Sequence, residues 1–538
     1  MLYSMKTNTK GLDAFLALAL CAAIFFLGFI NLDNNCDWGD DFAAYLSDGI
    51  AISEGRYKEQ TVLNLMLREA QTPEEAGRDG HVHAFGFPLF HALIYSFAGF
   101  DRIGFENLWL YKLPSLIFFA AMAGTYYLFL RHRLGRLISL FSTLMLCSAP
   151  VIYGSIRNLH NDVLYMALSL ISLYLAELIV EQKGKGKLFT ALLLGLSLWL
   201  SFSVRLNGIT VLITVLLYHV VQLLKGKKRP DTGDILPYLS FALLSLLFNI
   251  LLFPKPTSTS SVSDALIIER FATGFIYYIN QLYSWAFSCF HSIIVLPLTT
   301  VFHRLMPGFN ISPVAERLTG ICAVIFLILS VVGMITEFRK NYHLVFYIVI
   351  SFIGTAALNL GQELRYLYVI LPHLIMLAFC TSGRIFSLLC GKIAKSALKL
   401  KRILRPALLL ICLVLCLFEA LPMLRAGLDN MQNNNRELLT AYSEEAVEIY
   451  AYIQEETDED ETIAFFKPRA LYLNTGRVSM LPGRNGFEFS GADYYLFYKP
   501  MEEWDAVTEE YELRADILPI YELVKENGEF ALYRKIDE

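Results

Sequence analysis

The chain has 538 residues, of which 55% are hydrophobic and 14% aromatic, and its formal net charge at pH 7 is −5. Charged residues make up 18% of the chain, whereas a soluble globular domain carries about a quarter. This composition excludes an ordinary soluble protein and indicates a polytopic α-helical membrane protein. We expect membrane lipids as its surroundings and no nucleic-acid partner.

Eleven apolar stretches contain very few charges, and each is near the roughly 17–25 residues that cross a hydrocarbon core as a helix. They cover residues 14–32, 113–130, 137–156, 161–180, 188–204, 206–224, 235–253, 318–336, 342–360, 366–381 and 406–424. The first stretch is too long for a removable signal peptide and lacks a clear small-residue cleavage site. We therefore interpret it as a signal anchor.

Basic residues predict how these spans are oriented. Clusters occur at Arg131, Arg133 and Arg136, at Lys183, Lys185 and Lys187, at 225–229, at Arg339 and Lys340, and at 384–405. The positive-inside rule places all of them, with Lys6 and Lys10, in the cytoplasm. Eleven spans satisfy every cluster if the apolar segments 85–100 and 275–302 lie in the interface or re-enter. Counting both as spans gives thirteen, but it puts the clusters between 131 and 229 on the wrong face.

The net charge conceals an asymmetry between two regions. Residues 429–538 contain 25 acidic and 10 basic side chains, a net charge of −15, which leaves +10 on residues 1–428. We predict a transmembrane domain over 1–428 with a large first outer loop (33–84), followed by a small extracytoplasmic α/β domain over 429–538. The protein would be a multi-pass protein of the plasma (inner) membrane with a cytoplasmic N-terminus.

Polar residues gather in four clusters on the predicted outer face. The first outer loop supplies Asp40 and Asp41, about eight residues beyond the first span, then a helix-like stretch over 42–56 and the turn 81–88 with His83. The other three clusters are Arg157, His160 and Asp162 after the third span, Arg205 and Asn207 between the fifth and sixth, and Arg365 and Tyr366 before the tenth. Snorkelling to lipid phosphates would explain either Arg205 or Arg365 alone, and capping of a span would explain Asp162. The convergence of all four clusters on one face indicates a functional site, because ionisable residues in or beside spans are costly.

Two carboxylates, several arginines and a histidine at this face suit glycosyl transfer from a lipid-phosphate sugar. A carboxylate can take the proton of an attacking hydroxyl, and guanidinium groups can stabilise the charge on a departing phosphate. A divalent cation held by Asp40 and Asp41 could assist, but no cluster has decisive ligand spacing. His81 and His83 form a His-x-His pair in a loop, for which hydrogen bonding is the simpler role.

The order of these features resembles the membrane glycosyltransferases of the GT-C fold, specifically the protein O-mannosyltransferase and aminoarabinose-transferase-like family. The resemblance covers roughly residues 10–425 and rests on short motifs. It implies an inverting transfer from a polyprenyl-phosphate sugar to a lipid, glycan or protein acceptor. Carried over by position, Asp40 resembles the catalytic base and Asp41 its partner, although the two could be exchanged. Asp162 resembles the acidic residue that opens the fourth span, and Arg365 and Tyr366 resemble the contact to the donor phosphate. Many relatives have a basic residue before the proline of the interfacial helix, whereas Phe87 precedes Pro88 here, so the sugar stays open.

The last region predicts a small α/β fold. Residues 443–457 read as a helix capped by Ser443 with acidic residues in its first turn. Runs at 462–466, 493–498 and 529–534 read as strands. We expect 467–472 to form a loop that faces the membrane. The region would either shape acceptor access or form a solvated cap.

Two other classes of function fit parts of the pattern. A lipid or glycolipid transporter or flippase would use the same arginines to move an anionic head group, with Asp40 and Asp41 as a proton or cation site. Inverted repeats and paired broken helices would favour a transporter, and the sequence shows no clear example of either. A non-enzymatic membrane scaffold would not require charges clustered on one face.

Overall fold

The structure is a computed structural model of the whole chain. It describes residues 7–34, 36, 38, 40–69, 84–100, 107–147, 150–226, 230–252, 275–288, 290, 312–358, 364–391, 424–425, 428, 440–480, 492–500 and 520–536. Residues 406–423 of the predicted span 406–424 lie outside these residues, as do residues 289 and 291–302 of segment 275–302 and the histidines His81 and His83.

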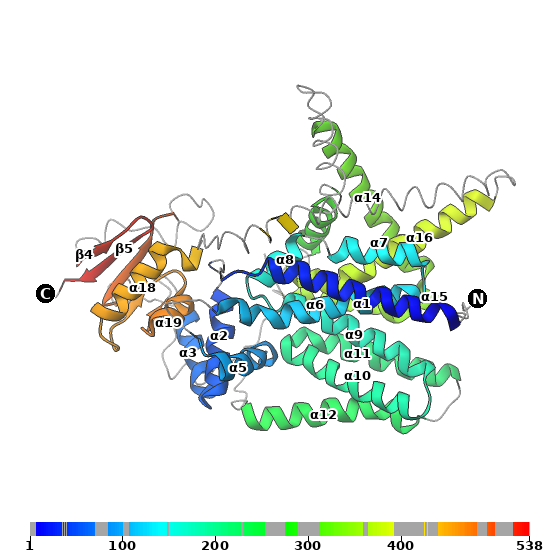
Figure 1. Cartoon of the computed structure of the whole chain (residues 1–538), viewed down its shortest axis with the longest axis horizontal. Coiled ribbons are helices and arrows are strands. Elements are labelled where there is room, and N and C mark those ends of the chain that lie inside the picture. Colours follow the sequence, from blue (N-terminus) through cyan, green and yellow to red (C-terminus); the bar gives the residue numbers. More distant parts are fainter. Residues whose placement is uncertain are drawn as a thin grey trace.

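Long apolar helices form a bundle, as the composition predicts (Figure 1). They are α1 (Thr7–Ile30), α6 (Leu108–Arg131), α9 (Asp162–Glu181), α10 (Gly184–Val204), α11 (Ile209–Gly226), α12 (Thr232–Leu252), α14 (Ser312–Thr336), α15 (Phe338–Leu358) and α16 (Leu371–Gly391). Within the described part of the chain, seven helices are long and apolar enough to cross a membrane. Leu18, Leu243 and Ile335 leave 70%, 67% and 74% of their surface exposed on the outside of the bundle, which suits contact with lipid rather than water.

One predicted span has a different local structure. The stretch 137–156 contains two helices, α7 (Arg136–Cys147) and α8 (Pro150–Arg157), rather than one. Pro150 lacks the backbone N–H that a continuous helix would need, whereas the first position of a new helix does not use that group.

The bundle helices approach one another closely where small residues lie between them. A Cβ atom added to Gly195 of α10 would lie 2.7 Å from the carbonyl oxygen of Pro237 in α12. Small residues allow such backbone contacts, which drive helix association in lipid. At the end of the bundle near the N-terminus, Asp13 of α1 pairs with Arg131 and Arg136, two of the residues assigned to the cytoplasm.

Three shorter helices cover the opposite end of the bundle (Figure 1). They are α2 (Asp40–Ser53), α3 (Tyr57–Glu69) and α5 (Gly86–Ala98), so the helix predicted from residue 42 onward is confirmed. α5 has 13 residues, fewer than the roughly 17 needed to cross a bilayer, in keeping with the predicted interfacial segment. α2 and α5 pack against each other at Gly49, where an added Cβ would lie 2.5 Å from Cβ of His91.

Gly49→Ala is therefore expected to lower the free energy of unfolding by about 1–3 kcal/mol, because the new methyl group has no space between α2 and α5. Thermal unfolding of the purified protein in detergent measures the change. Gly354→Ala is the matched control, because the open space around that helical glycine accepts a methyl group and alanine favours the helix. Equal melting temperatures for the two variants would contradict the close contact at Gly49.

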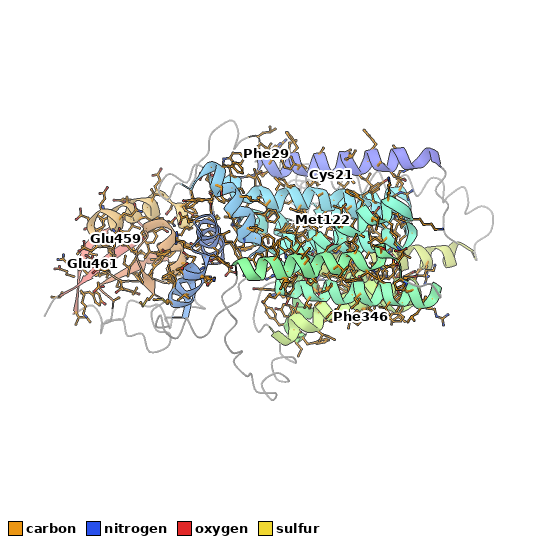
Figure 2. All side chains as sticks on the ribbon, turned by 90° about the horizontal axis from the view of Figure 1, so that it is seen from below. Cys21, Phe29, Met122, Phe346, Glu459 and Glu461 are labelled. Atoms are coloured by element: carbon orange, nitrogen blue, oxygen red, sulfur yellow. The ribbon has the colours of Figure 1, made fainter. Side chains whose placement is uncertain are left out.

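The C-terminal region is a small α/β unit beyond the short helices (Figure 1). It contains the 3₁₀ turn η3 (Thr440–Tyr442), the helices α18 (Glu444–Glu456) and α19 (Pro468–Thr475), and the strands β1 (Ile463–Ala464), β2 (Ser479–Met480), β3 (Tyr494–Tyr498), β4 (Tyr521–Glu526) and β5 (Phe530–Lys535). The strand order is β2-β1-β3-β5-β4, with β1 parallel to β2 and β3, and β5 antiparallel to β3 and β4. Glu459 and Glu461 lie on its side away from the bundle (Figure 2), where acidic side chains meet water.

The sequence-based predictions for this region are largely confirmed. The Ser443 hydroxyl accepts a hydrogen bond from the backbone N–H of Ala446 and caps α18. The three predicted strands are present as β1, β3 and β5, whereas β2 and β4 were not predicted. The predicted loop 467–472 is wrong, because this stretch lies largely in α19. Pro468 occupies a favourable first position and Gly476 ends the helix in the left-handed conformation.

Candidate active site

The start of α9 is held rigidly at the covered end of the bundle. Leu159, in the preceding link, has a φ of 53° and a fully buried side chain. It is the one non-glycine residue with positive φ in the described part of the chain, and such strain is commonly found at functional sites. The Asn161 amide donates a hydrogen bond of 2.9 Å to the carbonyl oxygen of Val204, the last residue of α10. This bond places the first residue of α9, Asp162, beside the residue that follows α10.

That following residue is Arg205, and its guanidinium forms an ion pair with Asp162. The Asp162 side chain is only 1% exposed and that of Arg205 14%. A carboxylate buried this deeply needs a charged partner. The guanidinium carbon of Arg205 also lies 4.1 Å from the ring centroid of Tyr366, within the range of a cation–π contact.

Arg365 brings the first outer loop to the same place. Its Nη2 lies 3.4 Å from Oδ2 of Asp41, and its Nε lies 4.0 Å from Oδ2 of Asp162. Its guanidinium carbon is 5.4 Å from the ring centroid of Tyr366. The structure thus brings together Asp41, Asp162, Arg205, Arg365 and Tyr366, which come from four separate segments of the chain; we call these five residues the acid–arginine cluster. Asp41 is its accessible carboxylate, since 42% of its side chain is exposed.

Tyr45 also belongs to this electrostatic environment, one helical turn after Asp41 on α2. Burial raises the pKa of the Tyr45 hydroxyl well above its usual value, and the charge of Asp41 adds to the rise. The charges of Arg205 and Arg365 act in the opposite direction. Tyr45 follows Asp41 by four residues, a spacing that places both side chains on one face of the helix.

Other predicted site residues lie outside the acid–arginine cluster or beyond what can be described. Asp40 is the first residue of α2, but its side chain lies outside the described atoms, and His83 lies outside the described residues. His160 lies in the link before Asp162, and its backbone N–H donates to the carbonyl oxygen of Ser155. Asn207 lies in the 3₁₀ turn η1 (Leu206–Gly208) directly after Arg205.

Arg157 instead forms an ion pair with Asp33, between α1 and α2. The fully buried Lys112 of α6 also binds Asp33, with Nζ 2.8 Å from Oδ1. Burial alone would raise the pKa of Asp33, but the charges of Lys112 and Arg157 hold the pKa below its usual value. Sequence reasoning missed this group because the predicted span began one residue after Lys112, although a lysine bordering a span was itself a signal.

Metal ligands do not converge in the part of the chain that the structure describes. There, no group of three or more His, Cys, Asp or Glu side chains is placed to hold a metal ion. The guanidinium of Arg365 supplies a positive charge beside Asp41.

A third carboxyl on α2, that of Asp48, is 1% exposed. Its Oδ1 accepts a hydrogen bond of 2.8 Å from the Asn64 amide of α3. Burial raises the pKa of Asp48 to about 7, although the charge of Arg469 on α19 and the bond from Asn64 lower it. Tyr57 of α3 faces the same carboxyl, whose charge adds to the rise that burial causes in the pKa of Tyr57.

Stability should therefore depend on pH through Asp48. A carboxyl whose pKa is higher in the folded than in the unfolded chain stabilises the fold fully below the unfolded pKa, and this contribution is lost as pH rises through about 7. Relative to Asp48→Asn, the wild type should lose on the order of 3–4 kcal/mol between pH 4 and pH 8. Thermal unfolding of both proteins in detergent at these two pH values tests this. If the free energy of unfolding changed equally between pH 4 and pH 8 in the wild type and in Asp48→Asn, the role of Asp48 would be contradicted.

Known proteins resemble this chain in sequence over one stretch and in structure over most of its length. A sequence model described as dolichyl-phosphate-mannose-protein mannosyltransferase matches residues 85–253. That stretch contains Asp162 and Arg205 of the acid–arginine cluster, whereas Asp41 and Arg365 lie outside it. None of the curated protein sequences matches the chain.

Solved structures resemble the whole chain. ArnT from Cupriavidus metallidurans bound to undecaprenyl phosphate matches with a TM-score of 0.51 and 12% identity, covering 97% of this chain and 98% of ArnT. Apo ArnT gives a TM-score of 0.51 and 11% identity over 99% of both chains. The archaeal oligosaccharyltransferase AglB from Archaeoglobus fulgidus, in complex with an inhibitory peptide and a dolichol-phosphate, gives 0.52 and 10% identity, covering 91% of this chain and 70% of AglB. The chain is thus a polytopic α-helical membrane protein with the GT-C fold, and the resemblance drawn from the sequence is confirmed.

Proposed function

We propose that the protein is an inverting glycosyltransferase that moves a sugar from a polyprenyl-phosphate donor to an acceptor hydroxyl at the outer face of the membrane. The observation that carries this proposal is the acid–arginine cluster, in which the accessible carboxylate of Asp41 lies beside Arg365, and Arg365 and Arg205 both lie beside the buried Asp162. The GT-C fold and the match to a mannosyltransferase model support the same class of reaction.

In this reaction the carboxylate of Asp40 or Asp41 accepts the proton of the acceptor hydroxyl as its oxygen attacks the anomeric carbon. The bond between that carbon and the donor phosphate oxygen breaks, and the polyprenyl phosphate leaves with the electron pair. The exposure of Asp41 supports this role, because an acceptor hydroxyl must reach the base. Asp162 is buried and acts by holding Arg205 in place.

The two guanidinium groups are proposed to bind the donor phosphate. Negative charge grows on the phosphate oxygen as the bond to the sugar breaks, and charge-assisted hydrogen bonds from arginine stabilise it. Tyr366 lies near both guanidinium carbons, so one aromatic ring restricts the conformations of both arginine side chains. His83, Arg157, His160 and Asn207 remain candidates for contacts to the rest of the substrate, and a divalent cation at Asp40 and Asp41 remains a candidate cofactor.

The proposal is tested with purified protein in proteoliposomes that contain undecaprenyl phosphate carrying either a hexose or an aminopentose. Membranes of the native cell supply the acceptor, and released undecaprenyl phosphate is quantified. We expect release from at least one donor with the wild type, and release slowed by at least about 10²-fold in whichever of Asp40→Asn and Asp41→Asn removes the base. Movement of intact donor across the bilayer without release of undecaprenyl phosphate would overturn the proposal in favour of a lipid transporter.

A further inference from the structure

The C-terminal region encloses the residue that leads into α2. Trp38, two residues before Asp40, is 6% exposed. Its ring lies 5.7, 5.3, 5.4 and 6.0 Å, centroid to centroid, from the rings of Phe465, Phe466, Tyr498 and Phe530. These four residues belong to the C-terminal region and lie at or beside β1, β3 and β5. Aromatic pairs at such separations favour definite relative orientations, so Trp38 is fixed by the sheet.

Two further contacts connect α2 itself with the C-terminal region. The ring of Phe42, next to Asp41, lies 6.0 Å from that of Tyr442 in η3. Farther along, α19 packs against α2 and α3. The Arg469 side chain of α19 is buried there and acts electrostatically on Asp48. α2 is therefore held by the C-terminal region near its start and two turns later.

The same helix carries Asp41 to Arg365 of the transmembrane bundle. α2 thus lies between the C-terminal region and the transmembrane bundle. The distance from Asp41 to the guanidinium of Arg365 therefore depends on how both of them hold α2. We infer that the C-terminal region is a positioning element of the active site: through Trp38, Phe42 and the packing of α19 against α2 it fixes α2 so that Asp41 stays beside Arg365. This inference deepens the proposed function and rests on it for the catalytic role of Asp41. The contacts by which the C-terminal region holds α2 do not depend on the proposed function.

Residues of the C-terminal region would then affect catalysis without touching substrate. A misplacement of about 1 Å can reduce a rate by about 100-fold. Arg469→Met and Phe466→Leu should accordingly lower kcat while the KM for the donor stays within about threefold. Arg469→Lys should restore part of the rate, because it returns a positive charge to the position near Asp48.

The decisive experiment measures hydrogen–deuterium exchange of the full-length protein in detergent, with no donor present. Peptides that cover residues 40–53 should exchange on the order of tenfold faster in Arg469→Met and in Phe466→Leu than in the wild type. The matched control is Arg534→Met, which removes an exposed arginine paired with Glu522 on the sheet and should leave α2 unchanged. Arg469 and Phe466 lie on different segments, so the result does not depend on one variant.

Wild-type exchange of α2 in both variants would overturn the inference, whether or not peptides of β3 and β5 keep their protection. Equally fast exchange in Arg534→Met would also overturn it, because the effect would then be general destabilisation. Neither outcome depends on sugar transfer. If the proteoliposome assay shows no release of undecaprenyl phosphate while α2 responds as expected, the proposed function fails and the positioning role stands.

Discussion

Asp41→Asn is expected to lower the rate of sugar transfer by about 10²–10⁴-fold, the range that a positioned general base contributes. The amide keeps the size of the side chain but cannot accept the proton of the acceptor hydroxyl. Its contact with Arg365 can persist through the amide oxygen, so the protein should fold and bind undecaprenyl phosphate as the wild type does. The rate is measured as undecaprenyl phosphate released per enzyme in proteoliposomes.

Asp40→Asn decides which member of the acidic pair is the base. The residue whose amide variant loses more of kcat at unchanged lipid binding accepts the proton, and the other is its partner. Glu54→Gln is the control, because Glu54 follows α2, is half-exposed and pairs with Arg56 rather than with the acid–arginine cluster. Wild-type rates in both Asp40→Asn and Asp41→Asn would remove the pair from the mechanism.

Arg205→Met is expected to reduce the free energy of unfolding by about 3–5 kcal/mol, the usual cost of removing one partner from a buried ion pair. The reason is the burial of Asp162, whose side chain is 1% exposed and would be left without the guanidinium with which it pairs. Thermal unfolding in detergent measures the loss. The added stabilisation that undecaprenyl phosphate provides should also fall, because one of two phosphate ligands is gone.

The double variant Asp162→Asn with Arg205→Met separates these two effects. Removal of the carboxylate charge should restore much of the stability, since no unpaired buried charge remains. Stabilisation by undecaprenyl phosphate should stay low, because the arginine is still absent. Failure of the second substitution to restore stability would show that Arg205 does not act through Asp162.

The candidate site was predictable as a set of residues but not as a geometry. Asp162, Arg205 and Arg365 lie in or beside apolar stretches, where charges are costly. Span counting placed them on one face together with Asp41 and Tyr366. Arg157 met the same criteria, yet it pairs with Asp33. Sequence position alone could not separate these cases, because a charge beside a span satisfies the same pattern whether it serves a substrate or a structural ion pair.

The sequence by itself determined the class of the fold, since long apolar stretches in lipid must satisfy their backbone groups within helices. It also determined the cap of α18 and the strands β1, β3 and β5, because these depend on local patterns. Only the tertiary structure decided that α19 is a helix packed on α2, that Trp38 is enclosed by C-terminal aromatic rings, and that Asp41 meets Arg365. The physical reason is range: hydrogen bonds within a helix join residues four apart, whereas Asp41 and Arg365 are separated by 324 positions and meet only through the packing of the helices that carry them.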